Sequence, residues 1–306
     1  MALASTRGRV WSSALFVVPD GFVPGDPLGR PARLFRPRAA GWPGAVHTFA
    51  DPFLFAHSER LFLFMESQAG NRPGTIVCHS TRDLKSFENV GSVLAAQHHL
   101  SYPFVFEWGG ETFMIPESAA AGEVGLYRFA DFPRGLEKVR VLLRGAYVDS
   151  SIVAHEGLLY LFTSSEAGLE LFSMRDLLAD TPRPHPRNPI TRDPALARCG
   201  GAPIRAGGRL FRLAQNGAWR YGEGLSACSV SRMSQDDYQE SVSSADILGK
   251  RRRWSAAGGH HMSLARFAGR TVVATDGQAD EPYGLWLAKR PAKWLARRIA
   301  RMRARA

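Results

Sequence analysis

The chain has 306 residues, of which 45% are hydrophobic, 22% charged and 10% aromatic, enough for one large or two small globular domains. These proportions exclude collagen-like, disordered and disulfide-scaffold proteins. The net charge is +11, but eight basic residues and no acidic residue lie between Trp286 and Ala306, which leaves about +3 on the other 285 residues. A uniformly basic nucleic-acid-binding protein is therefore disfavoured.

The N-terminal segment contains one predicted strand, Val10–Val18. Its apolar run, Ala14–Val18, is too short for a signal peptide, and no window of the chain approaches the ~20 apolar residues of a membrane helix. We therefore expect a cytoplasmic protein, either soluble or attached peripherally to a membrane.

Five later segments share one pattern, in which a short apolar strand, a polar or glycine-containing turn and a second apolar strand form a β-hairpin. Successive hairpins begin 51, 47, 52 and 60 residues apart, at Asp51, Tyr102, Asp149, Gly201 and His261. This period is typical of the four-stranded blades of a β-propeller. The fold class predicted is all-β, a five-bladed β-propeller.

The other strands of each blade follow the hairpins, and nineteen prolines and thirty glycines mark the turns between them. We expect these strands at residues 74–79, 88–94, 124–129, 138–143, 169–174, 225–231 and 283–288. Val10–Val18 supplies the missing outer strand of the last blade and closes the ring. One propeller domain then spans 1–288, and a basic amphipathic tail spans 289–306.

The propeller arrangement brings polar residues together at one mouth of the central channel. The residues that open the first strand of each hairpin meet those that close the second, which are Glu66, Glu117, Ser164, Gln215 and Thr275 or Asp276. Carboxyl groups gathered in this way shift one another's pKa, so that one can donate a proton while another stays ionised. Glycosidic-bond cleavage uses such a pair, although a single acid at a strand end is more often a turn cap.

Several motifs together resemble a known family: His47–Phe55 (HTFADPFLF), His99–Phe106 (HLSYPFVF), Met114–Ser118 (MIPES), Asp149–Ile152 (DSSI) and His260–His261. They resemble the propeller domain at the N-terminus of plant glucosamine inositolphosphorylceramide transferases and its stand-alone bacterial relatives. The likeness spans about residues 45–285. That domain is similar in architecture to glycoside hydrolase families 43 and 32.

The resemblance implies three catalytic residues. Asp51 matches the base or nucleophile of the first blade, Glu117 the general acid, and Asp149 the auxiliary acid that tunes pKa or orients the substrate. The hydrolases usually order these groups as Asp, Asp and Glu, whereas this chain has Asp, Glu and Asp. The location of the site is therefore better defined than the role of each carboxyl group.

Further side chains near the expected mouth are candidates for substrate binding: His98, His99, Tyr102, Arg198, Gln215, Tyr221, His260 and His261. An arginine suits an anionic group of the substrate, which it can hold through two parallel hydrogen bonds. The histidine pairs suit sugar hydroxyls or a phosphate, with backbone pairing at strand ends and metal binding as alternatives. We expect no cofactor and assign no metal site.

Two other residue types have a structural and a functional interpretation. Trp42, Trp108 and Trp219 either stack on sugar rings or, more commonly, pack between blades. Cys78, Cys199 and Cys228 are widely spaced and lack a CxxC pattern, so we expect buried free thiols.

The C-terminal segment 291–306 has apolar residues on one side of a predicted helix and arginines largely on the other. This composition is typical of an anchor at a membrane interface, while a solvated terminus is an equal alternative. The expected partners are a glycan or activated sugar and an anionic membrane surface reached through 291–306. No specific nucleic acid is expected.

Three functions follow as hypotheses. The first is a glycoside hydrolase-like enzyme that acts on a glycosidic bond at the channel mouth, with Asp51 as base or nucleophile and Glu117 as acid. The second is a glycosyltransferase of cell-surface polysaccharide or glycolipid synthesis at the cytoplasmic membrane face. The third is a propeller that binds glycans without catalysis.

Overall fold

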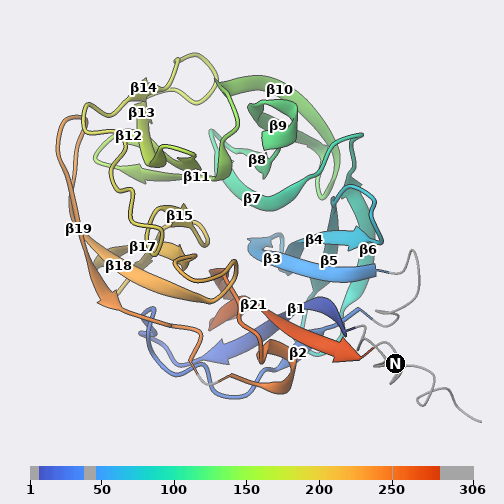
Figure 1. Ribbon diagram of the computed structural model, residues 1–306. Helices are drawn as coiled ribbons and strands as arrows, with labels where there is room; N and C mark the ends of the chain where they lie inside the picture. Colours follow the sequence, from blue (N-terminus) through green and yellow to red (C-terminus); the bar gives the residue numbers. More distant parts are fainter. Residues whose placement is uncertain (1–6, 38–45, 250, 283–306) are drawn as a thin grey trace, which may run out of the picture.

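The computed structural model describes residues 7–37, 46–249 and 251–282, which form a five-bladed β-propeller (Figure 1). The blades surround a central axis, with the first strand of each hairpin nearest to it. The described residues include two short 3-10 helices, Ala119–Ala121 and Arg253–Ser255, and no α-helix. The predicted fold class is confirmed, while the C-terminal helix predicted within 289–306 and the strand predicted at 283–288 lie outside the described residues.

Four blades are formed by consecutive strands. Blade 1 contains β3 (Val46–His57), β4 (Arg60–Ala69), β5 (Thr75–Thr81) and β6 (Glu88–Leu94). Blade 2 contains β7 (Ser101–Trp108), β8 (Glu111–Glu117), β9 (Glu123–Asp131) and β10 (Arg134–Arg144). Blade 3 contains β11 (Val148–His155), β12 (Leu158–Ser165), β13 (Gly168–Met174) and β14 (Arg183–Pro184). Blade 4 contains β15 (Arg198–Cys199), β16 (Ile204–Ala206), β17 (Arg209–Asn216), β18 (Gly224–Met233) and β19 (Tyr238–Ser244).

Blade 5 joins the two ends of the described chain. It contains β20 (Met262–Phe267), β21 (Arg270–Pro282), β1 (Arg7–Val18) and β2 (Arg33–Phe35). The antiparallel ladder between β1 and β21 runs from Arg7–Pro282 to Val18–Thr271. The N-terminal strand therefore takes the third position of the blade, where the sequence analysis placed it in the outer one. The three-residue strand β2 occupies the outer position, and it is too short to give a recognisable alternation of apolar and polar residues.

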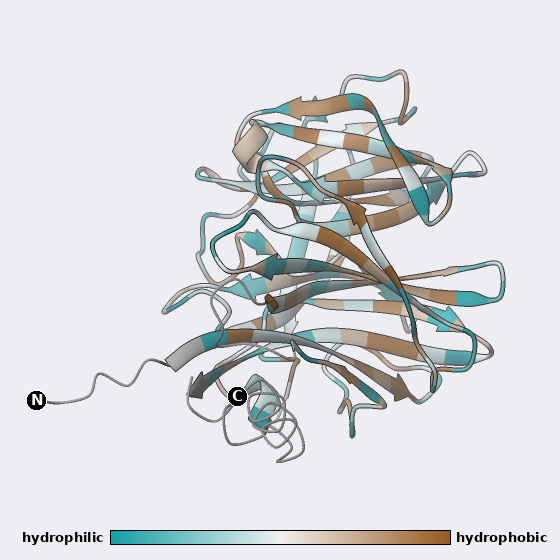
Figure 2. Ribbon diagram, turned by 90° about the vertical axis from the view of Figure 1, so that its right-hand side faces the viewer, coloured by the Kyte–Doolittle hydropathy of each residue, from teal (hydrophilic) through white to brown (hydrophobic). Residues whose placement is uncertain are grey.

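The hydrophobic core is divided into clusters that lie between neighbouring blades. One cluster joins blades 1 and 2 around Phe64 and Met114, and another joins blades 4 and 5 around Phe211 and Val273. Both faces of an inner strand are therefore covered, and in β4 the run Leu61–Ser67 is buried without interruption. In the side view, apolar stretches run along the strands, and the connecting turns are mostly hydrophilic (Figure 2).

The residues that open the first three hairpins have an unusual backbone conformation. Asp51, Tyr102 and Asp149 have φ angles of +49°, +45° and +55°. The register of each hairpin shifts at the same place, between Ala50 and Phe53 in blade 1 and at the equivalent positions of blades 2 and 3. A β-bulge redirects the side chain at the strand end, and a left-handed conformation is costly for residues other than glycine. The three bulges thus mark this end of the propeller as a candidate site.

The remaining expectations concern strands, thiols and membranes. The sequence analysis overlooked β14 and β19, which have two and seven residues. The three cysteines are buried and free, as predicted. Among the described residues, no helix has the length and apolarity required to cross a membrane.

Candidate active site

Asp51 lies at the centre of the candidate site and is buried. Its Oδ2 accepts a hydrogen bond from the backbone N–H of Tyr102, 3.2 Å away, and its own N–H points to Asp276 Oδ2 at 3.4 Å. Asp51 and Tyr102, which open the hairpins of blades 1 and 2, are therefore linked to Asp276 of β21. Side chains separated by up to 225 residues meet here because the ring brings every blade to the same axis.

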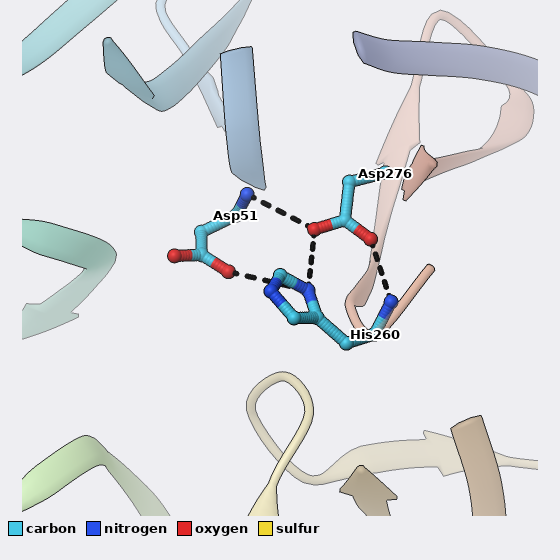
Figure 3. Close-up of side chains that lie close together, drawn as sticks. All are labelled: Asp51, His260 and Asp276. Carbon is cyan, nitrogen blue, oxygen red and sulfur yellow. Dashed lines mark hydrogen bonds and ion pairs between the residues drawn. The ribbon is translucent and has the colours of Figure 1, made fainter. Parts of the chain in front are cut away.

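Asp276 and His260 form a buried ion pair beside Asp51 (Figure 3). His260 Nδ1 lies 2.6 Å from Asp276 Oδ2 and 3.8 Å from Asp51 Oδ1. The backbone N–H groups of His260 and His261 donate to Asp276 Oδ1 over 2.8 and 3.0 Å. Trp11 of β1 stacks on the imidazole of His260, with ring centroids 4.4 Å apart. The imidazole is therefore fixed in position and in orientation.

The electrostatics of these three residues are coupled. Burial raises the pKa of Asp51 to about 7, with Asp149 and Asp276 adding to the effect and His260 opposing it. Burial disfavours the charged form of His260, but Asp276 outweighs burial and raises its pKa to about 9. Burial also acts to raise the pKa of Asp276, and His260 more than offsets this, so the pKa lies below its usual value. Near neutral pH the site holds an imidazolium–carboxylate pair beside a carboxyl group that titrates.

These three side chains also bring one possible metal ligand each within 4.8 Å of one another. A metal bound at 2.0–2.2 Å in tetrahedral geometry separates its ligand atoms by roughly 3.3 Å. The 2.6 Å between His260 Nδ1 and Asp276 Oδ2 is too short for that arrangement and fits a shared proton. The geometry is that of an ion pair, and we assign no metal to it.

Asp149 is held by two residues of blade 4. Its Oδ2 accepts hydrogen bonds from Arg198 Nε at 2.5 Å and from Gln215 Nε2 at 3.0 Å. Gln215 also donates to the carbonyl of Cys199 over 2.7 Å, which fixes the amide. The Arg198 side chain remains 38% exposed, so part of it is accessible to a ligand. The structure therefore brings together three of the residues predicted from sequence.

Glu66 is a buried carboxyl group that the sequence analysis named only as a strand end. Its Oε1 lies 3.4 Å from His99 Nε2, and His99 Nδ1 accepts a hydrogen bond from the N–H of Gly74 at 3.0 Å. This bond places the proton of neutral His99 on Nε2, facing Glu66. Burial, followed by the Asp51 carboxylate, raises the pKa of Glu66 well above its usual value. The protonated form of Glu66 is therefore favoured relative to that of an exposed glutamate.

Glu117, the expected general acid, has a different environment. Its Oε2 accepts a hydrogen bond from Ser101 Oγ at 2.7 Å and its Oε1 accepts one from the N–H of Ala119 at 2.8 Å. These contacts hold the Glu117 carboxyl group in place at the end of β8, and its role as general acid stays a prediction.

Tyr221 joins the ion pair to the exposed surface. Its hydroxyl lies 2.7 Å from His260 Nε2, and Arg198 Cζ lies 5.2 Å from the centroid of its ring. Tyr221 is 47% exposed, although burial of the phenol and then the Asp51 carboxylate raise its pKa well above the usual value. The sequence analysis counted Tyr221 and His260 as separate ligands and did not detect their contact, because 39 residues separate them.

Other predicted ligands have mainly structural surroundings. His261 is completely buried against Phe53 and Tyr102, and burial lowers its pKa to about 3. Tyr102 is also buried, and its hydroxyl accepts a hydrogen bond from the N–H of Gly201 at 3.0 Å. Within the described parts of the chain, no hydrogen bond or ion pair connects His98 to the cluster.

The predicted tryptophans fall into different environments. Trp108 packs against the core cluster of blades 2, 3 and 4, whereas Trp219 is 87% exposed on the loop that carries Tyr221. Trp42 lies outside the described residues. The stacking tryptophan within the site is Trp11, which the sequence analysis did not identify because it treated β1 only as a closing strand.

Comparison with known proteins identifies a matching family. Residues 37–278 match the family model described as "Glucosamine inositolphosphorylceramide transferase 1, N-terminal". The chain belongs to this family. It is 31% identical over 244 residues to glucosamine inositolphosphorylceramide transferase 1 of Arabidopsis thaliana, an alignment that covers 74% of this chain and 32% of the plant protein. The transferase of Oryza sativa subsp. japonica is 32% identical over 257 residues, covering 79% and 34%.

The family member described here thus spans about a third of the length of these relatives. Solved glycoside hydrolases share its fold. A family 117 hydrolase from Zobellia galactanivorans superposes with a TM-score of 0.53 and 14% identity, covering 93% of this chain and 98% of the hydrolase. An α-L-arabinofuranosidase from Clostridium thermocellum gives a TM-score of 0.54 and 12% identity, covering 72% and 80%. At these identities the likeness shows the fold alone.

Proposed function

We propose that this protein is a carbohydrate-active enzyme that acts on a glycosidic bond, in the manner of a glycoside hydrolase, at the end of the propeller axis where Asp51 lies. The observation that carries the proposal is a buried Asp51 whose pKa of about 7 lies near neutrality, among three further acidic residues, Glu66, Asp149 and Asp276. Carboxyl groups with separated proton affinities are what glycosidic-bond chemistry requires.

In this mechanism Asp51 is the base or nucleophile. As a base it removes the proton of the attacking hydroxyl group or water, and the nearby His260 imidazolium stabilises its charged form. Asp149, fixed by Arg198 and Gln215, orients the substrate. Glu117, held by Ser101 and by the N–H of Ala119, contacts the sugar hydroxyls.

A second candidate function is glycosyl transfer in the synthesis of a cell-surface polysaccharide or glycolipid. The names of the plant relatives favour it. This chain covers only about a third of those proteins, so their activity need not reside in the shared propeller. In this function Asp51 activates an acceptor hydroxyl, and the substrate is an activated sugar.

The test is glycan turnover, followed by mass spectrometry, for the wild type and Asp51→Asn. The substrates are aryl furanosides, aryl pyranosides and sugar nucleotides with lipid acceptors. We expect the variant to lose at least ~10²-fold in rate, because the amide cannot accept the proton. Free sugar supports hydrolysis, and an extended acceptor supports transfer.

Asp149→Glu is a useful comparison, because it keeps the charge at a supporting position and should retain part of the rate. If the wild type releases or transfers no sugar from any of these substrates, the proposal of catalysis fails. A glycan-binding propeller then becomes the better explanation, and the same panel measured by calorimetry would show binding without turnover.

A further inference from the structure

Three side chains form a continuous hydrogen-bonded chain from the buried interior to the exposed end of the propeller. It starts at Asp276, passes through His260 over 2.6 Å and reaches the Tyr221 hydroxyl over 2.7 Å. Asp276 and His260 are buried, while Tyr221 exposes nearly half of its surface. An acid, an imidazole and a hydroxyl group in this order form the arrangement by which proteins move a proton to or from the hydroxyl group.

Further contacts, mostly within blade 5, fix each member of the chain. The two backbone N–H groups of His260 and His261 hold Asp276 Oδ1, and Trp11 covers one face of the imidazole. Gly222 follows Tyr221, and a Cβ atom at this glycine would lie 2.6 Å from the Trp11 ring. Only glycine allows the loop to approach Trp11 so closely, which brings the Tyr221 hydroxyl to His260.

The partners of His260 determine which group donates in its hydrogen bond with Tyr221. Its Nδ1 faces the carboxylates of Asp276 and Asp51, and both favour the imidazolium. Nε2 of an imidazolium is a donor, so the Tyr221 oxygen accepts a hydrogen bond from it. The hydroxyl proton of Tyr221 is then free to point toward a ligand. Arg198, above the phenol ring, adds a second cation that stabilises a phenolate.

We propose that Tyr221 is the general acid of this site and that His260 and Asp276 are the positioning residues that return its proton. The proposal rests on the proposed glycosidic-bond function. A new bond forms from the anomeric carbon to the attacking oxygen, which belongs to the hydroxyl group or water that Asp51 deprotonates or to Asp51 itself. As the bond from the anomeric carbon to the leaving oxygen breaks, its electron pair stays on that oxygen, which takes the Tyr221 hydroxyl proton. The phenolate oxygen takes the proton of His260 Nε2. His260 becomes neutral and keeps its Nδ1 proton toward Asp276.

Glu66 is the rival proton donor, because it is a buried carboxyl group whose pKa is raised by burial. Its conjugate base would form beside Asp51, Glu117 and Asp276, with His99 at 3.4 Å as its one ion-pair partner among the described residues. The phenolate of Tyr221 forms against the His260 imidazolium at 2.7 Å and receives a proton from it. This difference favours Tyr221 as the proton donor. A comparison of Tyr221→Phe with Glu66→Gln decides between the two residues.

The experiment measures turnover of a series of aryl and alkyl glycosides that differ only in the pKa of the leaving group. We expect Tyr221→Phe to lose ~10²- to 10⁴-fold in rate with alkyl leaving groups. With 2,4-dinitrophenyl, which needs no proton, the loss should fall to a few-fold. His260→Gln should show the same dependence on the leaving group. Tyr127→Phe, in the third strand of blade 2, is the matched control and should keep the wild-type rate throughout.

The inference is overturned if Tyr221→Phe keeps the wild-type rate with alkyl glycosides. It is also overturned if Glu66→Gln shows the leaving-group dependence and Tyr221→Phe shows an equal loss for every leaving group, which is the signature of a structural role. Failure of the proposed function looks different, because the wild type would then turn over no glycoside at all. Thermal unfolding of each variant, followed by circular dichroism, identifies any that do not fold.

Discussion

At the scale of single residues, the site is defined by opposite shifts of neighbouring groups. Asp51 and Glu66 have raised pKa values, whereas that of Asp276 is lowered. All three carboxyl groups are buried, so burial alone would raise every pKa. The difference arises because His260 lies 2.6 Å from Asp276 and 3.8 Å from Asp51. One imidazole therefore decides which carboxyl group is ionised and which can exchange a proton.

The raised pKa of His260 predicts a pH dependence of stability. The native value is about 9, against about 6.5 in the unfolded chain, so native His260 binds its proton more tightly. Its contribution is fully present below pH ~6.5 and is lost as the pH rises toward 9, a change on the order of 3 kcal/mol. The charged or titratable groups that face it are Asp51, Arg198, Tyr221, His261 and Asp276.

The measurement is the free energy of unfolding in urea at intervals from pH 6 to 9.5, for the wild type and His260→Gln. The wild type should lose stability more steeply than the variant across this range. The difference in slope is the informative quantity, because Asp51 and Glu66 are buried carboxyl groups that also contribute to the pH dependence. Parallel curves would contradict the assignment of the imidazolium.

At the scale of strands, the hairpin openers show how one repeat position serves several purposes. In blades 1, 2 and 3 the opener is Asp51, Tyr102 or Asp149 in a left-handed bulge. In blade 4 it is Gly201, with a φ angle of +139°. A Cβ atom there would lie 2.1 Å from the carbonyl oxygen of Met262 in blade 5. The contact between blades 4 and 5 requires a glycine at position 201. The opener of blade 4 therefore cannot carry a polar side chain, and the polar groups of this blade are those of Arg198 and Gln215.

This contact predicts that Gly201→Ala destabilises the propeller by about 3 kcal/mol or more, because the clash is with backbone and the φ angle is unfavourable. The matched control is Gly208→Ala, at a hairpin turn with φ +71° and no atom within 4 Å of the added Cβ. That variant should lose about 1 kcal/mol, from the φ angle alone. Chemical denaturation of both proteins measures the difference, and equal losses would show that the approach of Gly201 to Met262 carries no cost.

At the scale of the whole molecule, the ring is closed by pairing the first described strand with the last. The ladder between β1 and β21 makes blade 5 from both ends of the chain, and one parallel bridge from Trp11 to Thr48 joins β1 to blade 1. The same closure delivers Trp11 to His260. The strand pairing that closes the ring therefore also completes the site.

The C-terminal segment leads to a prediction about the intact protein. We propose that residues 291–306, with six basic residues and Trp294, attach the propeller to an anionic cytoplasmic membrane face. Each cation near such a surface contributes about 1 kcal/mol. Sedimentation with phosphatidylserine vesicles should recover the full chain at least ~10-fold better than a chain ending at residue 290, and high salt should remove the difference. Equal recovery, or equal binding to phosphatidylcholine vesicles, would refute this attachment.

The number of blades and the residues at which the hairpins begin could be predicted from the sequence alone. The hairpins at Asp51, Tyr102 and Asp149 could be found because alternation and turn residues are local properties that neighbouring residues reveal. For the same reason Asp51, Asp149 and Arg198 could be predicted as candidates from their positions at the openers. The outer strand β2, with three residues, carries too little local pattern to be predicted.

The hydrogen bonds, ion pairs and pKa shifts among these residues became apparent only from the tertiary structure. The pairing of Asp276 with His260 and of His260 with Tyr221, the fixed carboxylate of Glu117 and the raised pKa of Glu66 depend on burial and on distances of 2.6–3.4 Å. Most of these partners lie on different strands or loops, and the fold sets the distances between them. Electrostatic coupling falls with distance and strengthens on removal from water, and neither quantity is encoded in the order of the residues.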